Sequence, residues 1–439
     1  MTATKPTLSR RNMLRTSALG AAAIGAPMVI PSSALGFSGH IPPSERVTLG
    51  MIGHGNMMNP HMSGVLSHPG VQVLAVCDVD RNKREKAKAQ VEEKYATDAA
   101  SGTYKGCAAY NEHEKITDRS DIDAVFVVTP DHWHVPISLD AVRSGKDVYV
   151  EKPMSLTIQE GRILSDAVRR YGAVVQVGSQ QRSEYTFGKA VEMVRNGWIG
   201  KVHTVYASLG RFPDGKELPE EAIPEGFDYD RWLGPTPWKP YNRNRVAGNF
   251  GGGGWRAYWE YGARKNGDWG AHHYDIIQWA LGMDHSGPEF FFPQGYDDSG
   301  CQGYKYKNGP TIYRDYQGPD RKFNSMIEFH GEKGKIGVGR GGVLVSDPGE
   351  LKDRPLAPTD LRLAATTGHH LNFLNAIRTR ERTIADVEIG HRTATICHLS
   401  AISERLNRTL QWDPIREQII GDPQASKWLD RPRRAPYSL

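Results

Sequence analysis

Strands and helices alternate along the first part of this chain, and that alternation limits the folds open to it. The apolar segment RVTLGMI (46–52) predicts a strand that runs directly into Gly53-His54-Gly55. VQVLAVCDVD (71–80) predicts a second strand, and the intervening HMSGVLSH has the composition of a short helix. The same alternation continues to residue 182. It indicates a parallel sheet with helices on both faces, so we expect an α/β domain of the Rossmann type over residues 45–177.

The turn after the first strand has the features of a dinucleotide-binding loop. Gly53 permits a tight turn, Gly55 lets a pyrophosphate approach the backbone, and the next helix offers unpaired N–H groups. Met58 stands where a third glycine is usual. Asp78 ends the second strand, where a carboxylate can accept hydrogen bonds from both ribose hydroxyls. This carboxylate would repel a 2′-phosphate, so the sequence favours NAD, although Arg81 nearby leaves NADP open.

Three later strand ends carry polar or special residues: Thr129-Pro130, Glu151-Lys152-Pro153 and the stretch from Gly178 to Arg182. Ligands of open α/β sheets bind outside the carboxyl ends of the strands. A lysine beside the expected nicotinamide position can hold a substrate oxygen while negative charge develops on it. We therefore expect Lys152 to be catalytic.

The segment GDWGAHHYDIIQWALG (267–282) predicts a helix with a polar first turn and a buried second half. Asp268 and His272 are four residues apart, and Asp275 is three further on, so all three share one helix face. We expect His272 to act as an acid or base with a pKa near neutrality. Asp268 would bind the substrate hydroxyl or orient the imidazole, and Asp275 would support them.

Two other interpretations of this segment remain open. Asp268 and His272 could chelate zinc, but the adjacent His273 points about 100° away from His272 on a helix, and the sequence offers no further ligand cluster. We therefore expect no metal. The helix could also be purely structural, with buried and hydrogen-bonded histidines. A second doublet, His369-His370, precedes an amphipathic helix and favours a structural role.

The motifs TPDHWH, VYVEKPMSLT and GDWGAHHYD, in this order after the glycine turn, resemble the Gfo/Idh/MocA family of oxidoreductases. That family includes glucose–fructose oxidoreductase and inositol dehydrogenase. The resemblance runs from about Val47 to the carboxyl terminus. It implies a cis Lys152-Pro153 peptide, and its conserved positions fall on Thr129, Pro130, His134, Lys152, Arg182, Asp268, Gly270, His272 and Asp275.

These observations define a candidate site. The expected catalytic residues are Lys152, Asp268 and His272. The expected cofactor-binding residues are Gly53, Gly55, Asn56, Met57, Asp78, Thr129, Pro130, His134, Glu151 and Lys152. The expected substrate-binding residues are Arg182, Trp255, Tyr258, His273 and Asp275.

The second domain, over residues 178–425, is predicted to be α+β with an open, mostly antiparallel sheet, followed by a tail at 426–439. One face of that sheet could pair with another subunit, so a homo-oligomer is expected. Between the first strand of this domain and residue 267 the chain is irregular and rich in tryptophan. Its aromatic faces suit sugar rings, although they could equally form a small hydrophobic cluster beneath the loop.

The first 36 residues have the features of an export signal. Arg10 and Arg11 in SRRNML are followed by a weakly apolar run and by SALG, which resembles a twin-arginine signal. We expect export of the folded protein to the periplasm, with no stable membrane insertion. The four cysteines have no C-x-x-C spacing, and we expect four free thiols. A net charge of +5, spread along 439 residues, gives no support to nucleic-acid binding.

We therefore expect an exported NAD(P)-dependent oxidoreductase that acts on a secondary alcohol of a sugar, polyol or sugar acid. Free NAD is scarce outside the cytoplasm, so the cofactor should be tightly held and regenerated in place. One alternative is a redox-neutral glycosidase or lyase that works through a transient keto-sugar. Another is a carbohydrate-binding protein without enzymatic activity. The sequence does not name the substrate.

Overall fold

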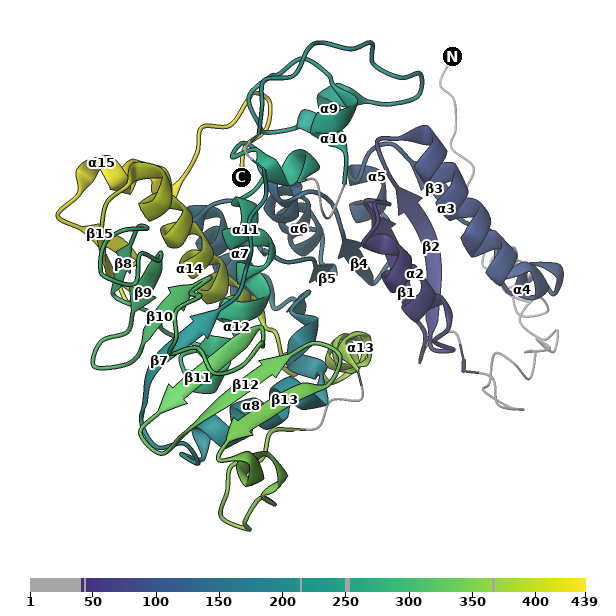
Figure 1. Cartoon of the computed structure of the whole chain (residues 1–439). Coiled ribbons are helices and arrows are strands. Elements are labelled where there is room, and N and C mark those ends of the chain that lie inside the picture. Colours follow the sequence, from purple (N-terminus) through teal and green to yellow (C-terminus); the bar gives the residue numbers. More distant parts are fainter. Residues whose placement is uncertain (1–40, 43–44, 214, 249–252, 365–367) are drawn as a thin grey trace, which may run out of the picture. The chain divides into compact units, whose positions relative to one another are not determined.

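The computed structural model describes residues 41–42, 45–213, 215–248, 253–364 and 368–439, so the expected signal at 1–36 lies outside the described residues. The chain divides into two compact units, Met1–Arg46 and Val47–Leu439. All features below belong to the second unit (Figure 1). Within the described ranges, no helix has the length and apolar character needed to cross a membrane. The four cysteines are free thiols.

The first sheet of this unit has six parallel strands in the order β3-β2-β1-β4-β5-β6. Its strands are β1 (Val47–Ile52), β2 (Val71–Cys77), β3 (Ala108–Tyr110), β4 (Ala124–Val127), β5 (Asp147–Val150) and β6 (Val175–Val177). Its helices are α2 (Met58–Leu66), α3 (Arg81–Lys94), α4 (Ala96–Ala100), α5 (Glu114–Thr117), α6 (His134–Arg143) and α7 (Ile158–Tyr171). The predicted Rossmann architecture is confirmed. The strand order reverses between β1 and β4, which places the glycine turn at the topological switch point.

The second sheet has nine strands in the order β13-β12-β11-β7-β10-β9-β8-β14-β15. Its strands are β7 (Val202–Ala207), β8 (Phe290–Phe292), β9 (Gly303–Lys305), β10 (Thr311–Arg314), β11 (Ile327–Gly331), β12 (Gly334–Gly339), β13 (Val343–Asp347), β14 (Leu410–Asp413) and β15 (Gln418–Ile420). Only β7 and β10 pair in parallel, so the predicted mostly antiparallel sheet is confirmed for the described residues. The sequence patterns did not reveal β9, β14 and β15.

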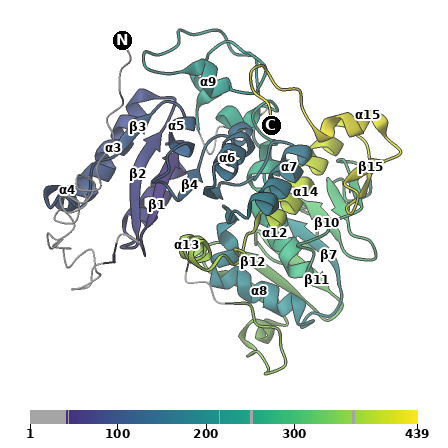
Figure 2. The same ribbon diagram turned by 180° about the vertical axis from the view of Figure 1, so that it is seen from behind.

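Helices α8 (Tyr185–Arg195), α12 (Gly270–Leu281) and α14 (Val387–Leu406) pack against this second sheet (Figure 2). The remaining α-helices are α9 (Tyr229–Leu233), α10 (Arg243–Val246), α11 (Arg264–Asp268), α13 (His369–Thr379) and α15 (Pro423–Ser426). Short 3-10 helices cover Asp131–Trp133, Gln180–Ser183, Gly254–Ala257, Gly349–Asp353 and Lys427–Leu429.

The carboxyl-terminal part of the chain returns to the first sheet. Phe373 and Leu374 of α13 are buried in one apolar cluster of the Rossmann domain. Tyr437 and Leu439, from the tail, pack against the other. The second half of the sequence therefore contributes to both cores.

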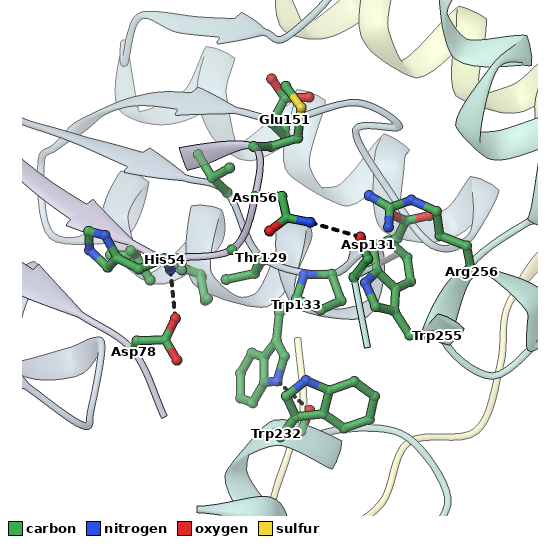
Figure 3. A pocket seen from close by; sticks show the side chains of 18 of the residues that line it. His54, Asn56, Asp78, Thr129, Asp131, Trp133, Glu151, Trp232, Trp255 and Arg256 are labelled. Atoms are coloured by element: carbon green, nitrogen blue, oxygen red, sulfur yellow. Dashed lines mark hydrogen bonds between the residues drawn. The ribbon is translucent and has the colours of Figure 1, made fainter. Parts of the chain in front are cut away.

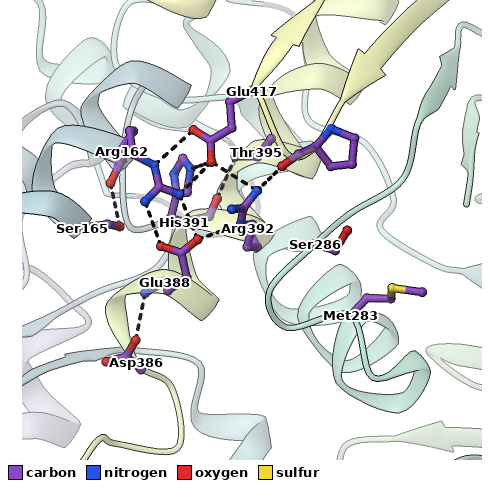
Figure 4. A network of polar contacts seen from close by, with 12 residues as sticks. Arg162, Ser165, Met283, Ser286, Asp386, Glu388, His391, Arg392, Thr395 and Glu417 are labelled. Atoms are coloured by element: carbon purple, nitrogen blue, oxygen red, sulfur yellow. Dashed lines mark hydrogen bonds and ion pairs between the residues drawn. The ribbon is translucent and has the colours of Figure 1, made fainter. Parts of the chain in front are cut away.

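A network of ion pairs links α7, which packs on the first sheet, to α14 and the β14–β15 turn of the second domain (Figure 4). Arg162 of α7 lies 2.8 Å from a carboxylate oxygen of Glu388 on α14 and 2.7 Å from one of Glu417, in the β14–β15 turn. His391 approaches Glu417 at 2.9 Å, and Arg392 approaches Glu388 at 2.8 Å. This network fixes α14 against the Rossmann domain and so helps to hold the two walls of the site in place.

Candidate active site

A cavity of about 520 Å³ opens at the carboxyl ends of β1, β4 and β5 (Figure 3). The glycine turn and Lys152 form part of its wall, and Asp268 and His272 come from the other domain. The cavity is also lined by the following expected residues: Asn56, Met57, Asp78, Thr129, Pro130, Glu151 and Trp255. The structure thus brings together residues from both domains beside the glycine turn.

The glycine turn has the shape that a dinucleotide requires. Gly53 has a φ of 87°, and a Cβ at this position would lie 2.7 Å from the carbonyl oxygen of Val128. A Cβ on Gly55 would meet nothing within 4 Å, so open space lies over the loop where a pyrophosphate would sit. The Asp78 carboxylate accepts hydrogen bonds from the backbone N–H of His54, at 2.6 Å, and of Asp80, at 2.8 Å. These residues fit NAD.

Replacing Gly53 should therefore remove the cofactor. We expect Gly53→Ala to lower the affinity for added NAD by at least about tenfold, because the new methyl group meets the Val128 carbonyl and the positive φ is unfavourable for alanine. Titration of nucleotide-free protein by calorimetry measures this change. Gly172→Ala is the matched control, since Gly172 also has a positive φ, of 66°, but nothing within 4 Å of its added Cβ. Equal NAD affinity in wild type and Gly53→Ala would contradict the assignment of the loop.

Lys152 and Asp268 form an ion pair inside the cavity. The Lys152 Nζ donates to Asp268 Oδ1 at 3.0 Å and to its backbone oxygen at 3.1 Å. The Lys152-Pro153 peptide is cis, as the family resemblance implies. Arg256 Nε also donates to Asp268 Oδ1, at 3.3 Å. Burial opposes ionisation of Asp268, but the charges of Lys152 and Arg256 outweigh it and lower the pKa of this carboxyl.

Glu151 anchors the strand end that carries Lys152. Its Oε1 accepts from Gln180 Nε2 at 2.6 Å and lies 3.0 Å from His61 Nε2, and the other ring nitrogen of His61 lies 2.8 Å from His370. Burial alone would raise the pKa of Glu151, but the hydrogen bond from His61 and nearby positive charge lower it to about 2. A Cβ on Gly178 would lie 2.5 Å from this carboxylate. Glu151 is therefore an ionised, closely packed support beneath Lys152.

His272 differs from the expectation of a near-neutral pKa. Burial lowers the pKa of His272 well below its ordinary value, and the charges of Lys152 and Arg340 lower it further. The imidazole is therefore neutral throughout the physiological pH range. Its Nδ1 is buried without a hydrogen-bond partner among the described residues. The expected single helix is also interrupted: α11 ends at Asp268 and α12 begins at Gly270, because His272 and His273 both donate their N–H to the Trp269 carbonyl.

Arg182 and Asp275 do not line the cavity, contrary to the expected substrate contact. Arg182 Nε donates to Asp275 Oδ2 at 2.8 Å, and its Nη2 donates to Asp284 Oδ1 at 2.7 Å. Both side chains of the Arg182–Asp275 pair are 1% exposed. Thr393 donates to the second oxygen of Asp275 at 3.0 Å. The pair is a buried brace between α12, α14 and the residues after β6.

Three further expected residues also lie behind the cavity wall. The ring nitrogens of His134 lie 2.7 Å from the Pro153 carbonyl and 2.9 Å from the Thr129 carbonyl, so it braces two cofactor loops without reaching the cofactor. His273 is fully buried beside the Trp269 ring, 5.5 Å away. Tyr258 donates its hydroxyl to the Lys216 carbonyl at 2.9 Å. Sequence spacing could place these residues near the site but could not show which way they point.

The cavity wall contains functional groups that sequence reasoning missed. Asp131 follows β4 within the TPDHWH motif, and burial raises the pKa of its carboxyl to about 8. Arg340 comes from a turn of the second sheet that no motif marks. Arg256 also lines the cavity, and it belongs to the tryptophan-rich region, where the sequence suggests it as a hydrogen-bond donor to hydroxyls or an acid. Trp232 belongs to a small aromatic cluster, as one interpretation of the tryptophan-rich region predicts, and it also lines the cavity. Stacking on a sugar ring stays a prediction.

A strap, defined here as residues 224–236, covers the outer part of the cavity and contains α9. Arg81 donates its N–H to the Gly226 carbonyl at 2.9 Å, and Asp228 donates to the Val79 carbonyl at 2.9 Å. The Asn111 side chain donates to the Asp228 carboxylate at 2.7 Å. Three residues of the strap line the cavity: Phe227, Arg231 and Trp232. The strap is thus fastened to the ends of β2 and β3, beside Asp78.

Among the described residues, no group of three histidine, cysteine or acidic side chains could hold a metal ion. The parallel sheet, the glycine turn and the Lys152–Asp268 pair define a dinucleotide-dependent oxidoreductase. The match to known families is specific. Residues 47–179 match the model described as "Oxidoreductase family, NAD-binding Rossmann fold", and residues 201–439 match "Oxidoreductase family, C-terminal alpha/beta domain". The chain belongs to the Gfo/Idh/MocA oxidoreductase family.

Individual relatives agree on the fold and differ in name. The chain is 32% identical over 212 residues to a glycosyl hydrolase family 109 protein of Saccharopolyspora erythraea, a match that covers 44% of each chain. It is 28% identical over 177 residues to an alpha-N-acetylgalactosaminidase of Shewanella oneidensis, which covers 39% of this chain and 37% of that one. The matched stretches therefore span less than half of these relatives.

Solved structures share the fold at low sequence identity. The WlbA dehydrogenase of Bordetella pertussis, in complex with NADH and UDP-GlcNAcA, has a TM-score of 0.55 at 18% identity, covering 84% of this chain and 99% of that one. The aldose-aldose oxidoreductase of Caulobacter crescentus has a TM-score of 0.56 at 18% identity, covering 83% and 99%.

Proposed function

We propose that this protein is an exported, NAD-dependent oxidoreductase that acts on a secondary alcohol of a sugar, polyol or sugar acid. The observation that carries the proposal is the meeting of Lys152, Asp268 and His272 in one cavity with a dinucleotide-binding turn. When bound, the nicotinamide ring accepts a hydride or returns it. Export and homo-oligomerisation belong to the same proposal.

The side chains of the cavity divide the remaining chemistry. Lys152 donates a hydrogen bond to the substrate oxygen and stabilises the charge that develops there. Asp268, which is ionised, accepts a hydrogen bond from the substrate and keeps the ammonium group in position. His272, neutral because burial lowers its pKa, has an unprotonated ring nitrogen that can accept the hydroxyl proton.

The strap supports a cofactor that stays bound through many turnovers. Its hydrogen bonds hold Phe227, Arg231 and Trp232 in the cavity wall close to Asp78, where they can contact a bound dinucleotide. A retained cofactor suits an exported protein, because free NAD is scarce outside the cytoplasm. A second substrate then returns the hydride to the cofactor while it stays bound.

A second candidate is a redox-neutral glycosidase or lyase, and Asp131 favours it. Beside Lys152 and Arg256, the cavity holds an ionised carboxyl, Asp268, and a carboxyl whose pKa is raised to about 8, Asp131. Elimination needs both a base and an acid, and such a pair supplies them. The names of the glycosyl hydrolase family 109 relatives point in the same direction.

The deciding experiment begins with nucleotide released by denaturation from protein purified out of the periplasmic fraction. We expect about one equivalent of NAD per chain by mass spectrometry. Sugars, polyols and sugar acids are then screened for a change in cofactor absorbance, alongside p-nitrophenyl glycosides for release of the phenol. A change in absorbance supports the oxidoreductase, and phenol release without net NADH supports the redox-neutral candidate. Protein that contains no nucleotide and binds none would overturn both.

A further inference from the structure

Arg340 lines the cavity but has no role in the proposed function. It lies in the turn between β12 and β13, followed by Gly341 and Gly342, which have φ values of 71° and 80°. Its guanidinium lies over the Trp269 ring, 4.8 Å from the ring centroid, and it lines the cavity. Within the described part of the chain, no hydrogen bond or ion pair takes up this guanidinium. An exposed cation that is held in place by an aromatic ring and lines the cavity is available to a ligand.

Positive charge exceeds negative charge at this end of the cavity. Lys152 and Arg256 both form ion pairs with the ionised carboxylate of Asp268. Burial keeps Asp131, the next carboxyl, protonated below about pH 8. Glu184 also faces Arg340, but burial raises the pKa of Glu184 and no ion pair joins the two. Lys152, Arg256 and Arg340 therefore face two ionised carboxylates, Asp268 and Glu151, and in the described part of the chain neither of these forms an ion pair with Arg340. The remaining positive charge favours an anionic ligand.

The cofactor does not account for Arg340. The pyrophosphate and ribose positions lie at Gly55 and Asp78, whereas Arg340 stacks on Trp269, which joins Asp268 to the helix of His272. Arg340 and His272 both lie beside the Trp269 ring, whose centroid is 4.8 Å from the Arg340 Cζ and 6.1 Å from the His272 ring centroid. His272 also contributes a buried Nδ1 with no partner among the described residues, which can donate a second hydrogen bond to a ligand.

We propose that the substrate is an acidic sugar and that Arg340 binds its carboxylate at the mouth of the cavity. This inference rests on the proposed function, in which the ligand is a sugar-type alcohol, and it selects the sugar acids from that class. The planar guanidinium can take both carboxylate oxygens at once, while Lys152 and Asp268 hold the reacting hydroxyl of the same molecule. Arg340 is a binding residue in this arrangement and takes no part in proton transfer.

The test compares matched pairs of ligands on the NAD-loaded, full-length protein by calorimetry: glucuronate with glucose, galacturonate with galactose, and gluconate with sorbitol. We expect the acid of at least one pair to bind about tenfold more tightly than its neutral partner. Raising the ionic strength should reduce this preference. Arg340→Gln should abolish it, whereas Arg340→Lys should retain part of it. Arg416→Gln is the matched control, because Arg416 is 77% exposed and remote from the cavity lining.

The possible outcomes separate this inference from the proposed function. Neutral partners that bind as well as the acids, or a preference that survives in Arg340→Gln, would overturn the role of Arg340 and leave the sugar assignment standing. Wild-type protein that binds no member of any pair would overturn the sugar assignment itself, and the acidic sugar with it. Arg340 lies on an exposed turn, so its variants should fold normally.

Discussion

Replacing Lys152 by methionine should reduce turnover about 1,000-fold while the cofactor stays bound. In the proposed function the ammonium group is the donor to the reacting oxygen, and it also keeps Asp268 in place through contacts of 3.0 and 3.1 Å. Loss of one such donor from an enclosed site commonly costs about 10²–10³ in rate, and loss of the acid–base partner adds to this. The rate is measured in single turnovers of the bound cofactor with a substrate identified in the screen.

A control variant and a measurement of bound nucleotide test whether the loss of turnover comes from the missing ammonium group. Lys333→Met removes a lysine from the exposed β11–β12 turn and should leave turnover unchanged. Nucleotide released from Lys152→Met by denaturation should match wild type, since the glycine turn and Asp78 are intact. A Lys152→Met protein that turns over at the wild-type rate would remove the lysine from the chemistry. One that has lost its nucleotide would make it a cofactor-binding residue instead.

Much of the fold and part of the site could be predicted because their signals are local. The dinucleotide-binding pattern, a strand followed by Gly53 and Gly55 and then a second strand that ends at Asp78, lies within one short segment of the sequence. Asp268 and His272 are four residues apart in sequence, which predicts that they lie on the same side. Both line the cavity, although the helix is interrupted at Trp269. The alternation of strands and helices indicated the parallel sheet for the same reason. Short strands such as β9, with three residues, carry no period from which to predict them.

The remaining parts of the site depend on contacts between residues far apart in the chain. His61 meets His370 across 309 positions, and Asn56 reaches the Gly248 carbonyl across 192. Arg340 enters the cavity from a turn of the second sheet, and neither its spacing nor its neighbours distinguish it from a surface arginine. The sequence pattern also does not show how deeply an individual polar side chain is buried. The low pKa of His272 and the raised pKa of Asp131 both follow chiefly from desolvation, which only the packed structure reveals.

Arg182 illustrates how family resemblance can point to the right residue and the wrong role. Resemblance and chain position indicated a substrate contact, but the structure pairs its guanidinium with Asp275 and Asp284. The Trp279 ring lies beneath it, with the centroid 5.1 Å from Cζ. All three nitrogens of this buried cation donate to Asp275 or Asp284, and the side chain does not line the cavity. Its effect on activity should therefore come through stability.

Arg182→Met should cost about 3–5 kcal/mol of folding free energy, because it leaves Asp275 buried without its positive partner. The shift in the urea unfolding midpoint at constant slope measures this loss. Arg182→Met combined with Asp275→Leu should recover much of it, since the fully buried carboxylate is then gone and the Asp284 carboxylate, 22% exposed, can be hydrated. Arg354→Met is the matched control, an exposed arginine whose Cζ likewise lies 4.8 Å from a tryptophan ring centroid. A substrate-binding arginine would behave in the opposite way: the single variant would unfold at the wild-type midpoint and lose affinity for the sugar alone.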